Sequence, residues 1–332
     1  MNDRASAEPL VSVVLPTYKR AHVLPSAIRS VLNQTYPNLE LIVVDDNSPD
    51  ATRDVVASFS DPRIRYVRND PNLKLPRALN RGFSLSRGEY LTWTSDDNLY
   101  DLAAIERMVD VMRNKACDLV YADYYHFTDL DPDGRPLAIH HQKLPDSLQL
   151  EKGNHIGACF MYTREVYVAV GEYDPELFLV EDYDYFMRIA KRFRICHIAE
   201  PLYYFRRHDD ALYVSRFCEV KASDFLARYK NGLLSEANVL EAVVNLLLRN
   251  AEDLNNSFLR RSHRTVRGFS FRLTKLHETL LTEYLRWRLK GRVSRLLTDY
   301  RSSNISFAVA RDALCGLMRE VATIAYNEPQ IG

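Results

Sequence analysis

The chain has 332 residues, of which 46% are hydrophobic and 27% are charged, as in an ordinary soluble globular protein. The formal net charge is zero, so the overall charge indicates no class of partner. No apolar run reaches the roughly 18 residues of a membrane span, and the N-terminal sequence lacks the apolar core of a signal peptide. We therefore expect a cytoplasmic protein.

The first half of the chain alternates between short apolar runs and longer amphipathic ones. The apolar runs predict strands over residues 11–16, 39–46, 63–69, 90–95 and 118–127. Helices are predicted between them, over residues 22–33, up to about 58, 76–86 and 100–114. This alternation predicts an α/β fold, with a mostly parallel sheet covered by helices on both faces.

The second half changes character along its length. A hairpin-like turn is predicted at residues 131–134, a helix from near Glu181, and one or two strands within residues 194–208. Beyond Ser215 the pattern is helical, so we expect a domain over residues 1–215 and a helical region over residues 216–332. The five cysteines are odd in number and include no CxxC pair, so neither a disulfide framework nor a zinc site is expected.

Polar clusters follow three of the predicted strands, at residues 16–20, 45–48 and 95–98. Ligands of open parallel sheets bind beyond the carboxyl ends of the strands, so the three clusters predict one site. No glycine-rich phosphate loop follows the first strand. The adjacent Asp96 and Asp97 repel each other unless a hard cation such as Mg²⁺ or Mn²⁺ joins them. The alternative for such a pair is a helix cap in a solvated turn.

Five ordered motifs carry a resemblance to a known family: "VSVVLPTYKR", "SVLNQTYPNLELIVVDDNS", "GEYLTWTSDDN", "EDYDYFMRIAKR" and "YYFRRHDDAL". With them the chain resembles the inverting glycosyltransferases of family 2, from about Val11 to Leu212, and its motifs are closest to those of the spore-coat polysaccharide type. The resemblance implies the GT-A fold, a nucleotide-diphospho-sugar donor and a Mn²⁺ or Mg²⁺ cofactor.

The resemblance also implies roles for individual residues. Those that would contact the nucleotide-sugar are Pro16, Thr17, Tyr18, Arg20, Asp46, Arg77, Ser95 and Asp96. Within this set, Asp46 would accept a hydrogen bond from the imide N–H of uracil or thymine. Asp97 would bind the metal, with Asp96 and His208 as further ligands. Many members carry an Asp where this chain has Thr94, which leaves open which carboxylate holds the metal.

Asp182 matches the catalytic base of the family. An acceptor hydroxyl is a weak nucleophile, so a carboxylate must take its proton while the sugar is displaced from the diphosphate. Glu181 and Asp184 are competing candidates for this role or for acceptor binding. Each also has a structural alternative, because an acidic residue suits a helix N-terminus. His155 would line the acceptor pocket or serve in packing.

The C-terminal part is basic. Between Asn256 and Arg301, twelve Lys or Arg stand against three Asp or Glu, a local charge of +9 that leaves −9 for the rest. An apolar stripe crosses this segment, formed by Phe269, Leu273, Leu276, Leu280, Tyr284 and Trp287. It predicts either a membrane-surface helix or a helical subdomain, the latter with a homo-oligomer contact as one role. No nucleic-acid-reading motif accompanies the charge.

Together these features predict a metal-dependent inverting glycosyltransferase. Its donor would be a UDP- or dTDP-sugar and its acceptor a saccharide, a glycan or a glycolipid, with Asp182 as general base. Two alternatives remain open, a nucleotide-sugar-binding module without catalysis and a nucleotidyltransferase. The expected location is the cytoplasm, with peripheral contact at the inner face of the membrane as a further candidate.

Overall fold

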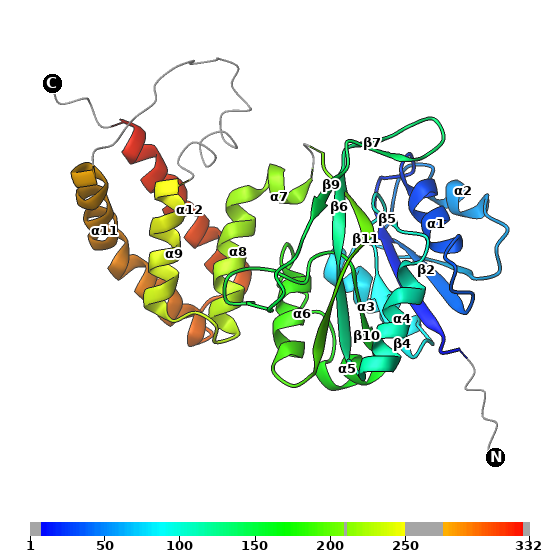
Figure 1. The fold of residues 1–332 in the computed structure, drawn as a ribbon. Coiled ribbons are helices and arrows are strands. Elements are labelled where there is room, and N and C mark those ends of the chain that lie inside the picture. Colours follow the sequence, from blue (N-terminus) through cyan, green and yellow to red (C-terminus); the bar gives the residue numbers. More distant parts are fainter. Residues whose placement is uncertain (1–7, 209–210, 250–274, 328–332) are drawn as a thin grey trace. The chain divides into compact units, whose positions relative to one another are not determined.

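The computed structural model of the chain describes residues 8–208, 211–249 and 275–327. Two compact units follow each other along the chain, Met1–His208 and Asp209–Gly332 (Figure 1). The division falls seven residues before the predicted boundary at residue 215. The reason is local: the last strand of the sheet ends at Arg206, and helix α7 (Leu212–Ser215) leads directly into helix α8 (Phe217–Lys230).

The first unit is built around a nine-stranded sheet. Its strands are β1 (Val11–Thr17), β2 (Leu39–Asp45), β3 (Ile64–Arg68), β4 (Tyr90–Trp93), β5 (Leu99–Tyr100), β6 (Leu119–Phe127), β9 (His140–Gln142), β10 (Phe160–Thr163) and β11 (Ile195–Arg206). The spatial order is β3-β2-β1-β4-β10-β6-β11-β5, and β9 pairs with β6. The neighbours from β3 to β4 are parallel, as are β6 and β11, whereas β10 runs antiparallel between β4 and β6. The five strands predicted for the first half are all present.

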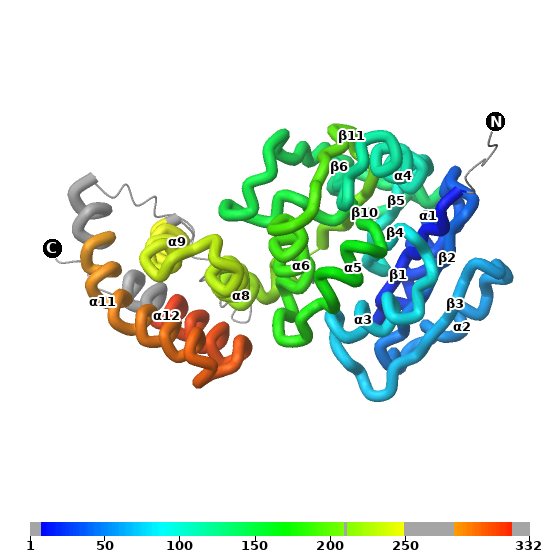
Figure 2. Tube along the Cα trace, turned by 90° about the horizontal axis from the view of Figure 1, so that it is seen from below, coloured from blue at the N-terminus to red at the C-terminus, as the bar shows by residue number. Residues whose placement is uncertain are grey.

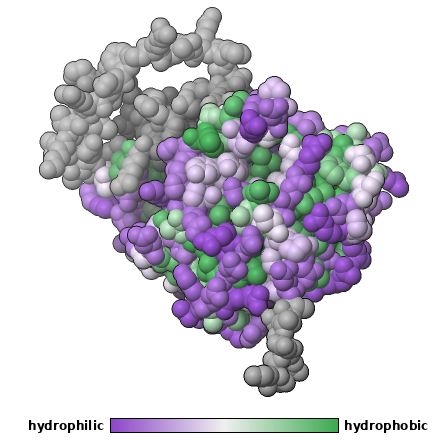
Figure 3. All heavy atoms as spheres, turned by 45° about the vertical axis from the view of Figure 1, so that its right-hand side comes forward, coloured by the Kyte–Doolittle hydropathy of each residue, from purple (hydrophilic) through white to green (hydrophobic). Residues whose placement is uncertain are grey.

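Helices cover both faces of this sheet, as predicted. The core cluster beneath one face includes α1 (Leu24–Leu32), α2 (Thr52–Ala57) and α4 (Ala104–Lys115). The other face carries α3 (Leu75–Leu85), α5 (Arg164–Val170) and α6 (Glu181–Ala190). A Cβ on Gly82 of α3 would lie 2.4 Å from Val14 Cγ1, so only glycine allows this approach to β1. On the surface seen in Figure 3, hydrophilic and hydrophobic residues are interspersed.

Two features of this unit differ from the sequence prediction. Tyr100, expected at the start of a helix, belongs to β5, which pairs with β11 at Tyr203, and the helix begins only at Ala104. A two-residue strand is too short to show a period of its own. The predicted turn at residues 131–134 is present and joins the short strands β7 (Asp129–Leu130) and β8 (Pro136–Leu137).

The sequence suggests no disulfide framework, but the structure contains a disulfide that the sequence analysis missed, between Cys117 and Cys196. They are 79 positions apart, but Cys196 of β11 pairs in register with Val120 of β6, close to Cys117. Parallel strand pairing therefore brings together two cysteines whose spacing in the sequence carries no signal. Cys159, Cys218 and Cys315 are buried and free.

The described residues of the second unit form helices, as predicted. They are α7, α8, α9 (Glu236–Arg249), α11 (Lys275–Arg301) and α12 (Phe307–Asn327). Helix α12 packs against α8, and α11 packs against α9 and α12 (Figure 2). None of the helices in the described ranges is long and apolar enough to cross a bilayer.

Two members of the apolar stripe predicted for this region are exposed on α11. Tyr284 is 36% exposed and Trp287 is 77% exposed, whereas the buried positions of α11 include Leu285, Leu289 and Val293. Phe269 and Leu273 lie outside the described residues, and the side chains of Leu276 and Leu280 are not described either. The two stripes are adjacent on the helix, and which of them faces the neighbouring helices depends on packing that the periodicity does not reveal.

Candidate active site

The carboxyl ends of the neighbouring strands β2, β1 and β4 meet at one edge of the sheet. Thr17 pairs in register with Asp45, and Val14 of the same strand pairs with Trp93. The loops after β1, β2 and β4 therefore start side by side, as the polar clusters of the sequence predict. The backbone of Lys19 and of Asn47 has φ of 59° and 67°, the left-handed region that non-glycine residues seldom adopt and that is common in functional loops.

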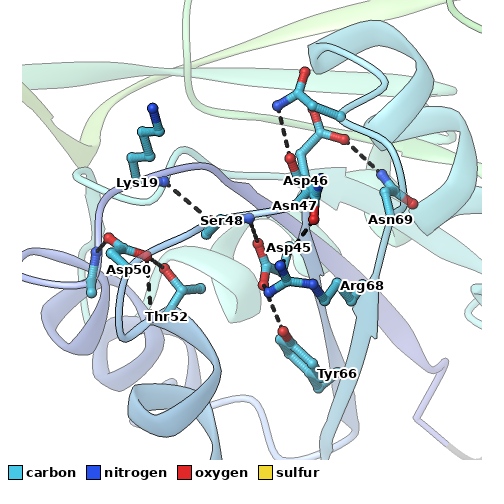
Figure 4. A network of polar contacts seen from close by, with 12 residues as sticks. Lys19, Asp45, Asp46, Asn47, Ser48, Asp50, Thr52, Tyr66, Arg68 and Asn69 are labelled. Atoms are coloured by element: carbon cyan, nitrogen blue, oxygen red, sulfur yellow. Dashed lines mark hydrogen bonds and ion pairs between the residues drawn. The ribbon is translucent and has the colours of Figure 1, made fainter.

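Asp45 stabilises the loop after β2 rather than facing a ligand (Figure 4). Its fully buried carboxylate accepts hydrogen bonds from the Tyr66 hydroxyl at 2.6 Å, from Arg68 Nη1 at 3.0 Å and from the Ser48 N–H at 2.7 Å. These donors fix the carboxylate between β2 and β3 and turn the chain at Ser48. Asp45 is thereby engaged within the protein, and Asp46 stays the predicted recognition residue of the pair.

Within the described part of the chain, three hydrogen-bond donors contact the Asp46 carboxylate, which can accept one more. Its Oδ1 accepts from Asn69 Nδ2 at 2.9 Å (Figure 4) and from the Leu73 N–H at 2.8 Å, and its Oδ2 accepts from the Lys74 N–H at 2.9 Å. A carboxylate has about four acceptor positions, so one on Oδ2 remains. A single N–H donor is what the imide of a uracil or thymine ring provides.

Asp97 lies at the centre of the second acidic cluster, after β4. Its Oδ2 is 3.3 Å from Arg20 Nη1 and 3.2 Å from His208 Nε2, and 12% of its side chain is exposed. Three distant segments of the sequence thus meet at one carboxylate oxygen. Loss of solvent and, second, the charge of Asp97 raise the pKa of Asp96 to about 7, against the opposing effects of Thr17 and Arg20.

The donor chemistry of this cluster suits a hard divalent cation. Carboxylate oxygens from Asp97 and Asp96 and the imidazole of His208 are ligands that Mg²⁺ and Mn²⁺ accept. A cation would also relieve the repulsion that raises the pKa of Asp96. Among the described residues no three His, Cys, Asp or Glu side chains are grouped closely enough to hold a metal, so the structure does not show Asp96, Asp97 and His208 as a formed metal site, and their role as ligands stays a prediction.

Asp182 occupies the first turn of α6 and has one donor on each oxygen. The Tyr183 N–H donates to Oδ1 at 2.7 Å, and Asn154 Nδ2 donates to Oδ2 at 3.0 Å. Burial raises the pKa of Asp182 to about 6, although both donors lower it. A carboxyl group with this pKa is ionised at neutral pH and still accepts a proton readily, as a general base requires.

The two acidic neighbours of Asp182 take part in structural contacts. Glu181 is buried and its Oε2 accepts from the Leu179 N–H at 2.9 Å, where the backbone has a φ of 91°. Burial and the Asp182 charge raise the pKa of Glu181 to about 8. Asp184 is fully buried and its Oδ2 accepts from Arg188 Nε at 2.8 Å. These contacts favour the structural alternative for both residues.

The remaining predicted residues are placed as follows. Pro16 is buried in β1, Ser95 is partly buried just after β4, and Tyr18 is 42% exposed. Arg77 is exposed in the first turn of α3. His155 is partly buried in the loop before β10, and its Nδ1 atom has no hydrogen-bond partner within the described part of the chain.

The structure also brings Asn154 into the site, a residue that the sequence analysis missed. Its segment, "KGNHIG", offered only a turn signal, an Asn followed by a Gly three positions later. Nothing in that signal indicates which distant side chain the amide of Asn154 contacts.

Comparison with known proteins defines the class. The fold is GT-A, and solved structures of similar fold include S. aureus TarS 1-349 in complex with UDP-GlcNAc (TM-score 0.57, 16% identity, 96% of this chain and 91% of that one). Another is the mannosyltransferase PcManGT from Pyrobaculum calidifontis with GDP-Man and Mn²⁺ (TM-score 0.56, 16% identity, 97% and 89%).

Sequence comparison gives a family match over part of the chain. Residues 12–171 match the model of Glycosyl transferase family 2. An uncharacterized glycosyltransferase of Rickettsia typhi is 32% identical over 212 residues, 60% of this chain and 65% of the relative. The Escherichia coli UDP-Glc:alpha-D-GlcNAc-diphosphoundecaprenol beta-1,3-glucosyltransferase is 33% identical over 115 residues, 35% and 46%. The chain thus spans less than two thirds of these curated relatives.

Proposed function

We propose that the protein is a metal-dependent inverting glycosyltransferase that moves a sugar from a UDP- or dTDP-sugar to a hydroxyl group of a saccharide, a glycan or a glycolipid. The match of residues 12–171 to the model of Glycosyl transferase family 2 supports the general activity. The observation that carries the proposal is the placement of three carboxylates on separate elements: Asp46 after β2, Asp97 after β4 and Asp182 at the start of α6. Asp46 is positioned to contact the nucleobase of the donor, Asp97 its diphosphate, and Asp182 the acceptor.

Asp46 would select the base of the donor. Its remaining acceptor position on Oδ2 suits the imide N–H of uracil or thymine, whereas cytosine has no N–H at that ring position. The three protein donors on Asp46 hold the carboxylate in place before the nucleotide arrives, so little orientational freedom is lost on binding. Tyr18, which is exposed beside this loop, would cover the ring.

Asp97, with Asp96 and His208, would hold Mn²⁺ or Mg²⁺. Such a cation supplies Lewis-acid stabilisation for the negative charge that develops on the departing diphosphate. Arg20, which contacts Asp97 at 3.3 Å, carries a positive charge within the same cluster and would add to that stabilisation.

Asp182 would act as the general base. In the proposed reaction its carboxylate accepts the proton of the acceptor hydroxyl, the hydroxyl oxygen bonds to the anomeric carbon, and the bond from that carbon to the diphosphate oxygen breaks. A single in-line displacement of this kind inverts the configuration at the anomeric carbon. The pKa of Asp182, raised to about 6, suits the role because the group is ionised at pH 7 and remains basic.

The acceptor would be a sugar on a lipid carrier or on a glycan. The E. coli relative is named for a diphosphoundecaprenol-linked acceptor, which motivates this part of the proposal. A lipid-linked acceptor would place the enzyme at the inner face of the membrane. Trp287, 77% exposed on the basic helix α11, is a candidate contact with the headgroup region.

The proposal is tested by donor consumption. UDP-, dTDP- and GDP-sugars are incubated with protein and Mn²⁺, with and without saccharide and polyprenyl-diphosphate-sugar acceptors, and release of the nucleoside diphosphate is followed. We expect release from UDP- or dTDP-sugars that is lost with EDTA and with Asp182→Asn. Tight nucleotide binding without release from any donor would favour the binding module, and release of pyrophosphate from a nucleoside triphosphate would favour the nucleotidyltransferase.

A further inference from the structure

The loop before β10 meets Asp182 through one side chain, Asn154. Its Nδ2 donates to Asp182 Oδ2 at 3.0 Å, while its Oδ1 accepts from the N–H groups of Ile156 at 3.3 Å and Gly157 at 3.2 Å. Only the oxygen of an amide accepts hydrogen bonds from backbone N–H groups. The backbone contacts therefore fix which way the amide faces, and they direct its NH₂ group toward Asp182.

Two further contacts hold this loop, one against α6 and one against β6. The Tyr183 hydroxyl donates to the carbonyl oxygen of Leu150, so the residue after Asp182 also contacts the loop. Gly157 has a φ of +72°, and a Cβ there would lie 2.9 Å from a ring carbon of Tyr124. The turn at residues 154–157 thus requires glycine for its conformation and for its contact with β6.

The carboxylate of Asp182 is consequently held at both oxygens. Oδ1 accepts from the Tyr183 N–H, which belongs to its own helix, and Oδ2 accepts from Asn154, which is 28 positions away. Each oxygen keeps an acceptor position for a hydroxyl proton. A lone side chain at a helix N-terminus keeps rotamer freedom, whereas a second anchor on Oδ2 restricts it.

We propose that Asn154 is a positioning residue for the general base, orienting the Asp182 carboxylate toward the acceptor hydroxyl. This inference rests on the proposed function of Asp182. Among the described residues, the titratable groups that face Asp182 include Glu181, on the same helix, and Tyr173, from the segment after α5; burial is the largest cause of the raised pKa of each, and the negative charge of Asp182 adds to it. Asn154 is the uncharged donor that reaches Asp182 from another element.

The first test titrates Asp182 directly and needs no activity. Aspartate labelled with ¹³C at the side-chain carboxyl gives one signal per residue, and the Asp182 signal is identified by its absence in Asp182→Asn. The variant Asn154→Ala removes both the donor and the oxygen that holds the turn, whereas Asn154→Asp keeps the oxygen but replaces the donor by a second carboxyl group beside Asp182. We expect the Asp182 pKa to rise by about one unit in Asn154→Ala, because an N–H group no longer stabilises the ionised form, and by more in Asn154→Asp, because repulsion between the two carboxylates adds to that loss.

The control is Asn80→Asp. Asn80 is a buried amide whose Nδ2 donates to the Tyr173 carbonyl oxygen at 2.8 Å and to Glu172 Oε2 at 3.4 Å, so the same change is made at a buried amide that does not donate to Asp182. We expect the pKa of Asp182 to be unchanged in this variant. Thermal unfolding of all variants separates a general loss of stability from a specific effect on Asp182.

The second test measures kinetics. In both Asn154 variants we expect kcat to fall about tenfold with the donor KM unchanged. We also expect the acidic limb of the pH profile of kcat to move to higher pH, together with the Asp182 pKa. A role confined to loop stability would lower activity equally at every pH and leave the limb in place.

The outcomes separate the two proposals. An Asp182 pKa that is the same in wild type, Asn154→Ala and Asn154→Asp overturns the inference about Asn154, whatever the activity. If the Asp182 pKa shifts in the Asn154 variants but the wild type transfers sugar from no donor, the contact between Asn154 and Asp182 is supported and the proposed function is overturned. Transfer that requires Asp182 but keeps its kcat in both Asn154 variants overturns only the positioning role.

Discussion

The Asp97 carboxylate lies 3.2 Å from the imidazole of His208, although 111 positions separate the two residues in the chain. Asp97 follows β4, and His208 follows β11 at the end of the first unit. Arg20, after β1, contacts the same oxygen of Asp97 at 3.3 Å. The candidate metal centre therefore depends on three connections of the sheet being formed correctly.

Replacing Asp97 should remove metal-dependent nucleotide binding. We expect Asp97→Ala to weaken UDP binding in the presence of Mn²⁺ by at least about tenfold, because the principal oxygen ligand is lost. His208→Ala should have a smaller effect in the same direction. Calorimetric titration with UDP, with and without EDTA, measures both. Asp110→Ala, an exposed aspartate of α4, is the matched control; UDP binding that neither Asp97→Ala nor EDTA changes would exclude the metal assignment.

Activity should depend on pH through Asp182. The raised pKa, about 6, means that the base is protonated and inactive below pH 6 and ionised above it. We therefore expect kcat to rise with pH, to reach half its maximum near pH 6 and to level off above pH 7. Asp182→Asn should lower kcat by roughly 10²–10⁴-fold. A wild-type profile flat from pH 5 to 8 would contradict the assignment of Asp182 as the base.

Glu181→Gln should stabilise the fold at alkaline pH. The pKa of Glu181 is raised from 4.5 to about 8 in the folded protein, so the unfolded chain releases this proton first and stability falls as the pH rises from 4.5 to 8. Glutamine is neutral at every pH and keeps an oxygen for the Leu179 N–H. We expect a gain of about 2 kcal/mol at pH 8 relative to pH 5.

Thermal unfolding at the two pH values measures this gain. Glu165→Gln makes the same change at an exposed glutamate in the first turn of α5 and should show no such pH-dependent difference. Equal shifts for Glu181→Gln at pH 5 and pH 8 would show that Glu181 is ionised in the folded protein across this range.

Reduction of the Cys117–Cys196 disulfide should destabilise the first unit. The bond closes a loop across 79 positions, and the chain-entropy model assigns such a loop about 4 kcal/mol as an upper limit. We expect a reductant to lower the melting temperature of the wild type but not that of the double variant Cys117→Ala/Cys196→Ala, which retains Cys159, Cys218 and Cys315 as free thiols. Alkylation and mass spectrometry of the unreduced protein count the bonded cysteines; five alkylated thiols would contradict the disulfide.

The predictions that succeeded rest on local patterns. The apolar runs that became β1 and β2 are buried along their whole length, so period and composition sufficed to identify them. Asp46, Asp97 and Asp182 were indicated because each stands in a motif at the end of a strand or the start of a helix. Their site roles remain predictions, which the experiments above test.

The predictions that failed, and the contacts that were missed, depend on pairing between distant segments. The disulfide follows from β6 lying beside β11, and β5 exists only because β11 offers it a partner at Tyr203. The amide of Asn154 reaches Asp182 only because the loop before β10 folds onto α6. A single sequence contains no measure of these approaches, since none of them leaves a periodic or compositional trace.

The antiparallel strand β10 has a consequence for where the proposed donor-binding and acceptor-binding residues lie. It separates β3-β2-β1-β4, whose loops carry Asp46 and Asp97, from β6-β11-β5, and it connects the loop of Asn154 to the segment that leads to Asp182. Its pairing with β4 spans only Tyr162 with Leu91 and Thr163 with Tyr90. In the proposed function, Asp46 and Asp97 would bind the donor from one side of β10, and His208, which follows β11, contacts Asp97 from the other side. The loop that carries Asn154 would then be free to change toward other acceptor hydroxyl groups while the strands that carry Asp46 and Asp97 stay the same.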